Sequence, residues 1–333
     1  MEEGGHVAGL MKSAPRWLVY LIEHGDLGVA IFFVLSGFVI SHTLYSVPIT
    51  RSIAWRFMLR RSLRLDPPYW FAIALAAAFG ILSSHFVANK SLPQISTQQV
   101  VAHLFYVQKI LGFADINPVF WTLCLEVQFY LVYVMLLAIG KHRARNFLMV
   151  AAFASLLWPL QIFTRNVWPG LFPPFWYAFL LGAAAYWTWR DSRLQPLLAA
   201  FILAVAIGGT YYQQNFELVS AGTALVLWIA AETGRIHTAL RWRWLQFLGA
   251  ISYSLYLTHN AITGASFRLG YRLTGETIVW EIVWSLITVA ACVAVGAAIW
   301  WLVEKPSIWL SRLVQLDVSD RNDSHAGREI AKS

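Results

Sequence analysis

The chain has 333 residues, and its composition excludes an ordinary water-soluble domain. Hydrophobic residues make up 58% of it and charged residues only 13%, whereas soluble domains carry about 25% charged residues. The net charge of +8 would suit a nucleic-acid partner, but the basic residues lie in short segments between apolar runs. We therefore expect no nucleic acid, and we read the basic residues as signals that orient the chain in a membrane.

Nine apolar runs have about the length that a helix needs to cross a bilayer, which is roughly 17 to 25 residues. They predict an all-α fold, a polytopic transmembrane helical bundle with membrane lipids around it. The predicted spans cover residues 28–45, 67–85, 119–139, 147–163, 171–189, 195–211, 216–232, 245–266 and 278–303.

Lysine and arginine are distributed unevenly between the two sets of alternate loops, and cytoplasmic loops are the ones enriched in them. One set, together with the C-terminal tail, holds 18 of the 25 basic residues and the opposite set holds 7. The larger group is therefore predicted to be cytoplasmic. It comprises Arg51, Arg56, Arg60, Arg61, Arg64, Lys141, Arg143, Arg145, Arg190, Arg193, Arg235, Arg241, Arg243, Lys305, Arg312, Arg321, Arg328 and Lys332.

This orientation divides the chain into three parts. Residues 1–27 form an extracytoplasmic N-terminal segment, residues 28–306 a membrane domain and residues 307–333 a cytoplasmic tail. No apolar run is available to carry residues 1–27 across, so either this segment is translocated unaided or one further helix precedes it. We expect the second case, which gives ten spans. In the outer connection 87–118, the run 100–113 is too short to span and predicts a re-entrant or interfacial segment.

Glu126 is the clearest candidate for a functional residue, because ionisable groups inside membrane spans are costly and commonly mark a functional path. It lies seven residues into its predicted span, roughly 10 Å below the outer surface at 1.5 Å per residue. Such a carboxylate has to be paired, hydrogen-bonded or protonated. A structural clamp to a neighbouring Trp, Tyr or His is the alternative to a catalytic part.

Histidine is the residue best suited to take a proton from a hydroxyl near neutral pH. His6 and His24 are predicted on the same side of the membrane as Glu126, as is His259, which lies near the outer end of its span. A packed, hydrogen-bonded histidine is the alternative for each. The only cysteines, Cys124 and Cys292, lie in apolar runs and are interpreted as packing residues, so we expect neither a disulfide nor a metal site.

Four arginines precede Pro67 and Pro68, where we expect a new helix to start. If the segment before the prolines is also helical, Arg56, Arg60 and Arg64 share one face, with Arg61 beside Arg64. Arginine binds phosphate through two parallel hydrogen bonds, so the cluster suits a phosphorylated ligand. Orientation of the chain and contact with lipid headgroups are the alternative explanations.

Several stretches together resemble the membrane acyltransferase-3 family, in order and over residues 28–306. They are the segment Gly28-Val29-Ala30-Ile31-Phe32-Phe33, Arg61 to Arg64 ahead of Pro67, Phe120-Trp121-Thr122-Leu123 with Glu126, the stretch from Gly249 to His259, and Glu304-Lys305-Pro306.

The resemblance implies a bacterial inner-membrane acyltransferase. It would transfer an acyl group, which we expect to be acetyl, from cytoplasmic acyl-CoA to a hydroxyl group of a cell-surface or exported glycan or glycolipid. Arg61 and Arg64, with Arg60 or Arg56, would bind the donor. The catalytic residues would be Glu126, His259 and, as the counterpart of the family's essential histidine, His6; His24 is the fallback. The family's basic residue ahead of that histidine has no counterpart in this chain, nor does the extra hydrolase-like domain of some relatives.

Ser36, Gly37 and Gly28 are small residues that let helices approach closely, and we expect them to leave room for the pantetheine arm. The histidine would deprotonate the acceptor, or would itself carry the acyl group for a time. Two other classes of function stay open. A transporter or flippase of a glycolipid would more often show internal repeats or helices broken in both halves, and a relative without activity would only bind glycan or proteins.

The charge bias gives a first testable prediction, which is that the segment 51–64 and the C-terminal tail face the cytoplasm. A cysteine placed at Ser62 should stay unmodified when intact cells are treated with a membrane-impermeant thiol reagent, and should react once the cells are opened. A cysteine placed in the outer connection 87–118 is the control that should react in both. Labelling at position 62 from outside would reverse the predicted orientation.

Overall fold

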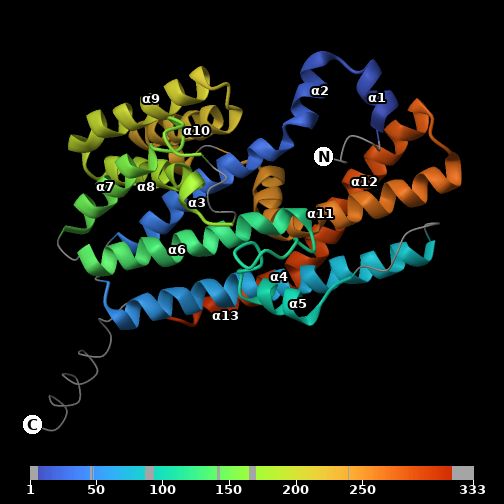
Figure 1. Cartoon of the computed structure of the whole chain (residues 1–333), viewed down its shortest axis with the longest axis horizontal. Coiled ribbons are helices and arrows are strands. Elements are labelled where there is room, and N and C mark those ends of the chain that lie inside the picture. Colours follow the sequence, from blue (N-terminus) through green and yellow to red (C-terminus); the bar gives the residue numbers. More distant parts are fainter. Residues whose placement is uncertain are drawn as a thin grey trace, which may run out of the picture.

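The computed structural model describes residues 7–45, 47, 49–86, 94–140, 143–164, 170–238 and 240–316. Within these residues the chain is helical and has no strand, which confirms the predicted all-α class (Figure 1). Five of the described segments are long and apolar enough to cross a membrane, so this is a multi-pass membrane protein; the total of nine spans stays a prediction. The five segments are Gly25–Leu44, Arg51–Leu82, Pro118–Gly140, Ser192–Tyr211 and Ile278–Arg312.

The first half of the chain forms two short helices and then the long ones that carry the predicted site residues. In order they are α1 (Ala8–Ser13), α2 (Arg16–Glu23), the single turn η2 (Gly25–Leu27), α3 (Gly28–Leu44), α4 (Arg51–Phe86), α5 (Thr97–Leu104), η3 (Pro118–Phe120) and α6 (Trp121–Gly140). His6 and the end of the predicted tail, residues 317–333, lie outside the described residues.

The second half begins with α7 (Ala144–Ser155), η6 (Pro173–Phe175), α8 (Trp176–Arg190), η7 (Ser192–Leu194), α9 (Gln195–Tyr211), α10 (Asn215–Glu232) and η8 (Arg235–His237). It ends with α11 (Arg243–Thr274), α12 (Ile278–Ile299), the π-helical turn η9 (Trp300–Glu304) and α13 (Lys305–Arg312). The expected helix 147–163 ends early, at Ser155, because Pro159 has no N–H to donate to the Ser155 carbonyl and its ring would clash with that carbonyl in a helix.

The prediction of a helix start at Pro67 is wrong, because α4 runs through both prolines as one helix of 36 residues. A proline removes one backbone hydrogen bond, and neighbouring groups commonly compensate for this in membrane helices. The prolines leave the carbonyls of Leu63 and Arg64 without a helical donor. Next to them, Tyr253 of α11 donates a hydrogen bond to the carbonyl of Leu65 at 2.9 Å. At 1.5 Å per residue α4 is about 54 Å long, against roughly 30 Å for a bilayer core, so part of it extends out of the membrane.

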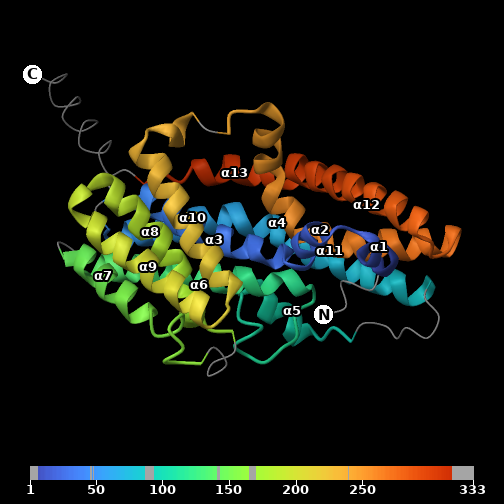
Figure 2. The same ribbon diagram turned by 90° about the horizontal axis from the view of Figure 1, so that it is seen from above.

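The helices form two groups that meet along α3, α4 and α6. Helices α7 to α10 gather on one side with α3, while α11 and α12 form a long pair on the other side, next to α4 (Figures 1 and 2). Three aromatic rings join the first group to the centre: Phe179 of α8 stacks on Phe33 of α3 and on Phe129 of α6, each with ring centroids 4.3 Å apart.

Two glycines bring α3 and α8 into backbone contact. A Cβ atom on Gly37 would lie 1.8 Å from the carbonyl oxygen of Phe179, and one on Gly182 would lie 1.8 Å from that of Val34. The expectation that small residues permit close approach is therefore met at Gly37. At Gly37 the backbone of α8 fills the space where a pantetheine arm was expected, whereas a Cβ atom on Gly28 would meet no atom within 4 Å.

The glycine contact predicts a clear difference between two alanine variants. Gly182→Ala forces α3 and α8 apart and should destabilise the protein by roughly 1–3 kcal/mol or more, the usual cost of overpacking. Gly28→Ala adds its methyl group to open space and serves as the matched control. Apparent melting temperatures of the protein in detergent, compared with wild type, measure both. Equal melting temperatures of the two variants would contradict the close contact.

Candidate active site

A cavity of about 270 Å³ lies where α3, α4 and α13 meet, and arginines surround it. Arg60, Arg61 and Arg64 line it from α4, as expected for residues spaced three and four positions apart on a helix. Arg56, the fourth arginine of the predicted group, does not line it. Arg312 lines it from α13. The sequence grouped Arg312 with the cytoplasmic basic residues but gave no sign that it joins this cluster. We call this space the arginine cavity.

Glu126 of α6 is 3% exposed and is tied to the arginine cavity through Tyr130. The hydroxyl of Tyr130 donates a hydrogen bond to its Oε1 atom, and Ser36 of α3 donates to the same atom at 2.9 Å. The guanidinium carbon of Arg61 lies 4.7 Å from the centroid of the Tyr130 ring. Arg61 and Arg64 are the cations that act on the carboxylate of Glu126. The carboxylate of Glu126 therefore interacts with two of the arginines that line the arginine cavity.

The sequence could have identified Tyr130, because a residue four positions along a helix lies on the same face as Glu126. It could not have identified Ser36 as a donor, since the two residues are 90 positions apart. The clamp that the sequence allowed as an alternative thus exists, and it consists of one tyrosine and one serine. Both hydroxyls donate, so the site suits a carboxylate acceptor.

His259 of α11 has its ring oriented by the backbone of its own helix. Its Nδ1 atom lies 2.7 Å from the carbonyl oxygen of Tyr256, and a carbonyl can only accept, so Nδ1 carries a hydrogen. In the neutral ring Nε2 then keeps its lone pair, as a general base requires. His24 makes the same kind of bond to Tyr20 at 2.9 Å, and its ring stacks on Tyr20 at 4.0 Å.

Among the described residues, no contact joins Glu126 directly to His259 or to His24. Tyr256 interacts with both residues: its ring centroid is 5.8 Å from that of His259, and its hydroxyl interacts electrostatically with the carboxylate of Glu126. Its hydroxyl bonds to Thr122 at 2.8 Å and donates to the carbonyl of Val119 at 3.1 Å. The structure thus associates Glu126 with the arginines more closely than with the histidines.

A second buried carboxylate, Glu304, lies in the π-helical turn between α12 and α13. The backbone N–H and the hydroxyl of Ser254 donate to its Oε2 atom at 3.2 and 2.5 Å. Arg64 is the cation that acts on it. π-Helical turns are frequent at functional sites, and the one signal for Glu304 in the sequence was the Glu304-Lys305-Pro306 stretch.

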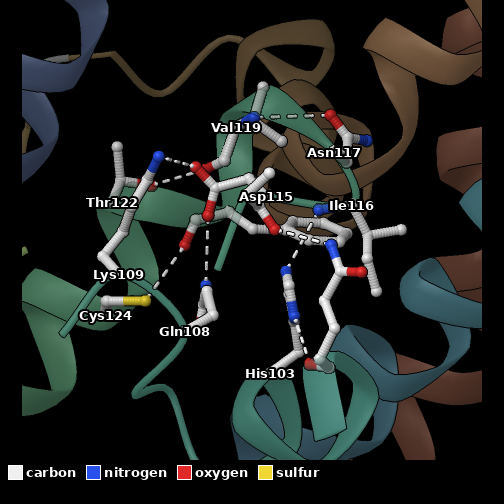
Figure 3. A network of polar contacts seen from close by, with 12 residues as sticks. His103, Gln108, Lys109, Asp115, Ile116, Asn117, Val119, Thr122 and Cys124 are labelled. Atoms are coloured by element: carbon white, nitrogen blue, oxygen red, sulfur yellow. Dashed lines mark hydrogen bonds and ion pairs between the residues drawn. The ribbon is translucent and has the colours of Figure 1, made fainter. Parts of the chain in front are cut away.

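The segment after α5 enters the bundle and is held by a polar network (Figure 3). Nε2 of His103 accepts from the N–H of Ile116 at 3.1 Å, and its Nδ1 donates to the carbonyl of Gln99 at 2.7 Å. Burial lowers the pKa of His103, so the ring is neutral and structural. Lys109 pairs with Asp115 at 2.7 Å.

Tyr106, in the turn after α5, anchors the same segment to the middle of α4. Its ring stacks on Tyr69 at 4.7 Å, and its hydroxyl donates to Asp66 at 2.8 Å. The packing ties this segment to α4, and its re-entrant or interfacial position in a membrane stays a prediction.

A second cavity, of about 150 Å³, lies between the C-terminal part of α4, the residues before α6, and α11. Asn117 and Asn260 line it, together with Arg268 and apolar side chains, and we call it the Asn260 cavity. From Arg64 to Ala76, the nearest wall residues on α4, is 12 positions, or about 18 Å along the helix axis. The two cavities therefore lie at different levels of one helix. No group of three histidine, cysteine or acidic side chains in the described part of the chain could hold a metal ion.

Three bacterial proteins show similarity over most of the chain. The candidate peptidoglycan O-acetyltransferase YrhL of Bacillus subtilis (strain 168) is 25% identical over 85% of this chain and 50% of its own length. Nodulation protein 10 of Rhizobium leguminosarum bv. viciae is 27% identical, over 85% of this chain and 82% of its own. The O-acetyltransferase OatA of Staphylococcus aureus (strain NCTC 8325 / PS 47) is 24% identical, over 83% and 51%.

The chain thus spans about half the length of YrhL and OatA. No solved structure matches it. The family model described as an acyltransferase domain matches residues 4–303, which include the arginines of α4, Glu126 and His259. This match confirms the family that the sequence motifs predicted, and with it the acyltransferase class. The chain belongs to the acyltransferase-3 family.

Proposed function

We propose that this protein transfers an acyl group from acyl-CoA to a hydroxyl group of a cell-surface or exported glycan, and that the acyl group is acetyl. It would do so in the bacterial inner membrane, with its C-terminus in the cytoplasm. The observation that carries the proposal is the arginine cavity and its link through Arg61 and Tyr130 to the buried Glu126. Family membership and the names of YrhL and OatA support the class of reaction.

The donor end of the reaction fits the arginine cavity. Acyl-CoA carries several phosphate groups, and arginine binds phosphate through two parallel, charge-assisted hydrogen bonds. Four guanidinium groups reach one space here, from Arg60, Arg61, Arg64 and Arg312. The positive-inside bias favours a cytoplasmic position for this end of α4, on the side where acyl-CoA is available.

The chemical step needs one base and balances without a metal. A histidine takes the proton of the acceptor hydroxyl, and the oxygen attacks the thioester carbonyl. The carbon–sulfur bond breaks, the new ester forms, and the CoA thiolate leaves and takes up the proton. In the alternative, the histidine itself is acylated first and passes the group on.

Glu126 and His259 take part in this proposal together with His6, which remains the base implied by the family resemblance. His24 is the fallback, although its Nδ1 bond and its stacking on Tyr20 also suit an interfacial residue. Transfer or hydrolysis of radiolabelled acetyl-CoA by the purified protein in nanodiscs tests the function. A glycolipid flippase would instead move a fluorescent glycolipid between leaflets without consuming acetyl-CoA.

The arginine cavity predicts that Arg61→Ala and Arg64→Ala each raise the Michaelis constant for acetyl-CoA by about tenfold or more, the effect of losing a charged hydrogen bond. Lysine at either position should recover only part, because it offers a point charge in place of a planar fork. Arg56→Ala, outside the cavity, is the matched control. Michaelis constants measured at equal protein levels decide this. If the Michaelis constant for acetyl-CoA is unchanged in both alanine variants, Arg61 and Arg64 serve only to orient the chain in the membrane.

The histidine assignment predicts that His6→Ala lowers the transfer rate by on the order of 10²–10⁴-fold, as removal of a general base does, while expression stays normal. His24→Ala should have a much milder effect. Acetyl transfer by both variants, at matched membrane levels, is the measurement. If His6→Ala is fully active, the assignment fails, and Glu126 with His259 becomes the leading pair.

A further inference from the structure

We infer that Arg60 and Arg312 bind the phosphate monoester of the donor, which is the 3′-phosphate on the ribose of CoA, and that they make the protein prefer CoA over dephospho-CoA. The inference rests on the proposed function, since it concerns the donor of that reaction. It deepens that function, because it divides the arginine cavity into two parts that bind different phosphates.

The lining of the arginine cavity carries several positive charges without matching negative ones. Arg60, Arg61, Arg64 and Arg312 line it, and no described residue of the lining is acidic. Arg60 and Arg64 lie four positions apart on α4, where two like charges destabilise a helix. Repulsion among these cations falls when an anion binds between them. The cavity therefore favours a ligand with several negative charges.

Two of the four arginines already interact with groups inside the bundle. Arg61 lies over the ring of Tyr130, with its guanidinium carbon 4.7 Å from the ring centroid, and acts on the carboxylate of Glu126. Arg64 acts on the same carboxylate and also on that of Glu304. These two arginines thus form the part of the cavity next to the buried carboxylates.

Arg60 and Arg312 have no such partners. Within the described part of the chain, neither makes a hydrogen bond, an ion pair or a contact with an aromatic ring. A guanidinium has five N–H donors, so both side chains keep their full capacity to bind an oxyanion. Two arginines of this kind suit a phosphate monoester, which carries close to two negative charges near neutral pH and three acceptor oxygens.

Arg60 and Arg312 lie nearer the start of α4 than Arg64 does. Arg60 precedes Arg64 by four positions, which is about 6 Å along the helix. Helix α13 runs back along α4 toward the start of α4 (Figures 1 and 2). Arg312, its last residue, follows Glu304 by eight positions, or about 12 Å. Because Glu304 interacts with Arg64, Arg312 lies on the same side of Arg64 as Arg60, toward the end of α4 predicted to be cytoplasmic.

The order of groups in acyl-CoA matches this order of arginines. From the thioester, the molecule continues through the pantetheine arm to the two-phosphate bridge, and then to the ribose with its 3′-phosphate. In the proposed reaction the thioester approaches Glu126, so the bridge meets Arg61 and Arg64. The 3′-phosphate follows toward the cytoplasm and meets Arg60 and Arg312. A donor without this phosphate leaves the last two arginines without an anion.

Binding of CoA and of 3′-dephospho-CoA, which differ only in this phosphate, tests the inference. The purified full chain is placed in phosphatidylcholine nanodiscs, and both dissociation constants are measured by calorimetry. We expect wild type to bind CoA at least about tenfold more tightly, the effect of a charged hydrogen bond. Arg60→Gln and Arg312→Gln should each weaken the binding of CoA and leave that of dephospho-CoA unchanged.

Two matched variants serve as controls. Arg61→Gln removes a group that binds the bridge, so it should weaken both ligands alike and keep the ratio of their dissociation constants. Arg51→Gln removes the same charge from the start of α4, outside the cavity, and should change neither constant. An arginine that only stabilises the C-terminus of α13 would change the melting temperature and not the ratio. Equal affinity of wild type for the two ligands, or an unchanged ratio in Arg60→Gln or in Arg312→Gln, overturns the inference.

Phosphatidic acid carries the same phosphate monoester as a lipid headgroup, and nanodiscs that contain it separate the two sources. If the lipid occupied this part of the cavity, it would weaken the binding of CoA to wild type more than to Arg312→Gln, and the inference would be wrong. We expect phosphatidic acid to change the affinity of both proteins for CoA by the same factor.

Hydrolysis or transfer of the acetyl group is followed separately, with acetyl-CoA and acetyl-dephospho-CoA as donors. A preference for CoA in binding without any turnover of acetyl-CoA contradicts the proposed function and leaves the phosphate site in place. Turnover of both donors without a preference in binding contradicts the phosphate site and leaves the proposed function in place.

Discussion

Helices α3 and α8 touch backbone to backbone at Gly37 and Gly182, and the position of the central carboxylate follows from this contact. Because the two helices approach so closely, Phe179 can stack on Phe33 and on Phe129, which fixes α6 against both helices. Ser36, the neighbour of Gly37, then reaches Glu126 of α6 at 2.9 Å. A side chain in place of either glycine would push α3 away from α8, and the Ser36 hydroxyl that bonds to Glu126 would move with α3.

Charged groups inside a membrane protein are costly, so the way they are satisfied indicates how the site is built. Glu126 is buried yet receives two hydroxyl hydrogen bonds, and Arg61 lies over the ring of Tyr130, which provides one of them. Attraction between a cation and the face of an aromatic ring adds to that arrangement. Together these contacts couple the arginine cavity to a carboxylate within the bundle, and an acyl donor bound at the arginines would lie next to it.

Helix α4 carries both cavities, and it can do so because it passes through Pro67 and Pro68 without ending. Contacts from two other segments support it at the prolines: Tyr253 bonds to the carbonyl of Leu65, and Tyr106 bonds to Asp66. The result is one rigid element with arginines near its start and the Asn260 cavity near its end. Sites on such an element keep a fixed separation along the helix axis.

The sequence by itself determined the membrane class, the helical fold and the family, because composition, apolar run length and ordered motifs are local properties of the chain. It also identified the arginine cluster of α4, since helical spacing puts Arg56, Arg60 and Arg64 on one face with Arg61 beside Arg64, and all of these except Arg56 line the cavity. Only the tertiary structure decided that Arg312 joins them, that Ser36 bonds to Glu126, that α4 continues through its prolines, and that Asn117, Asn260 and Arg268 share a cavity. These are contacts between segments far apart in the chain, and no periodicity in the sequence encodes which helix faces which.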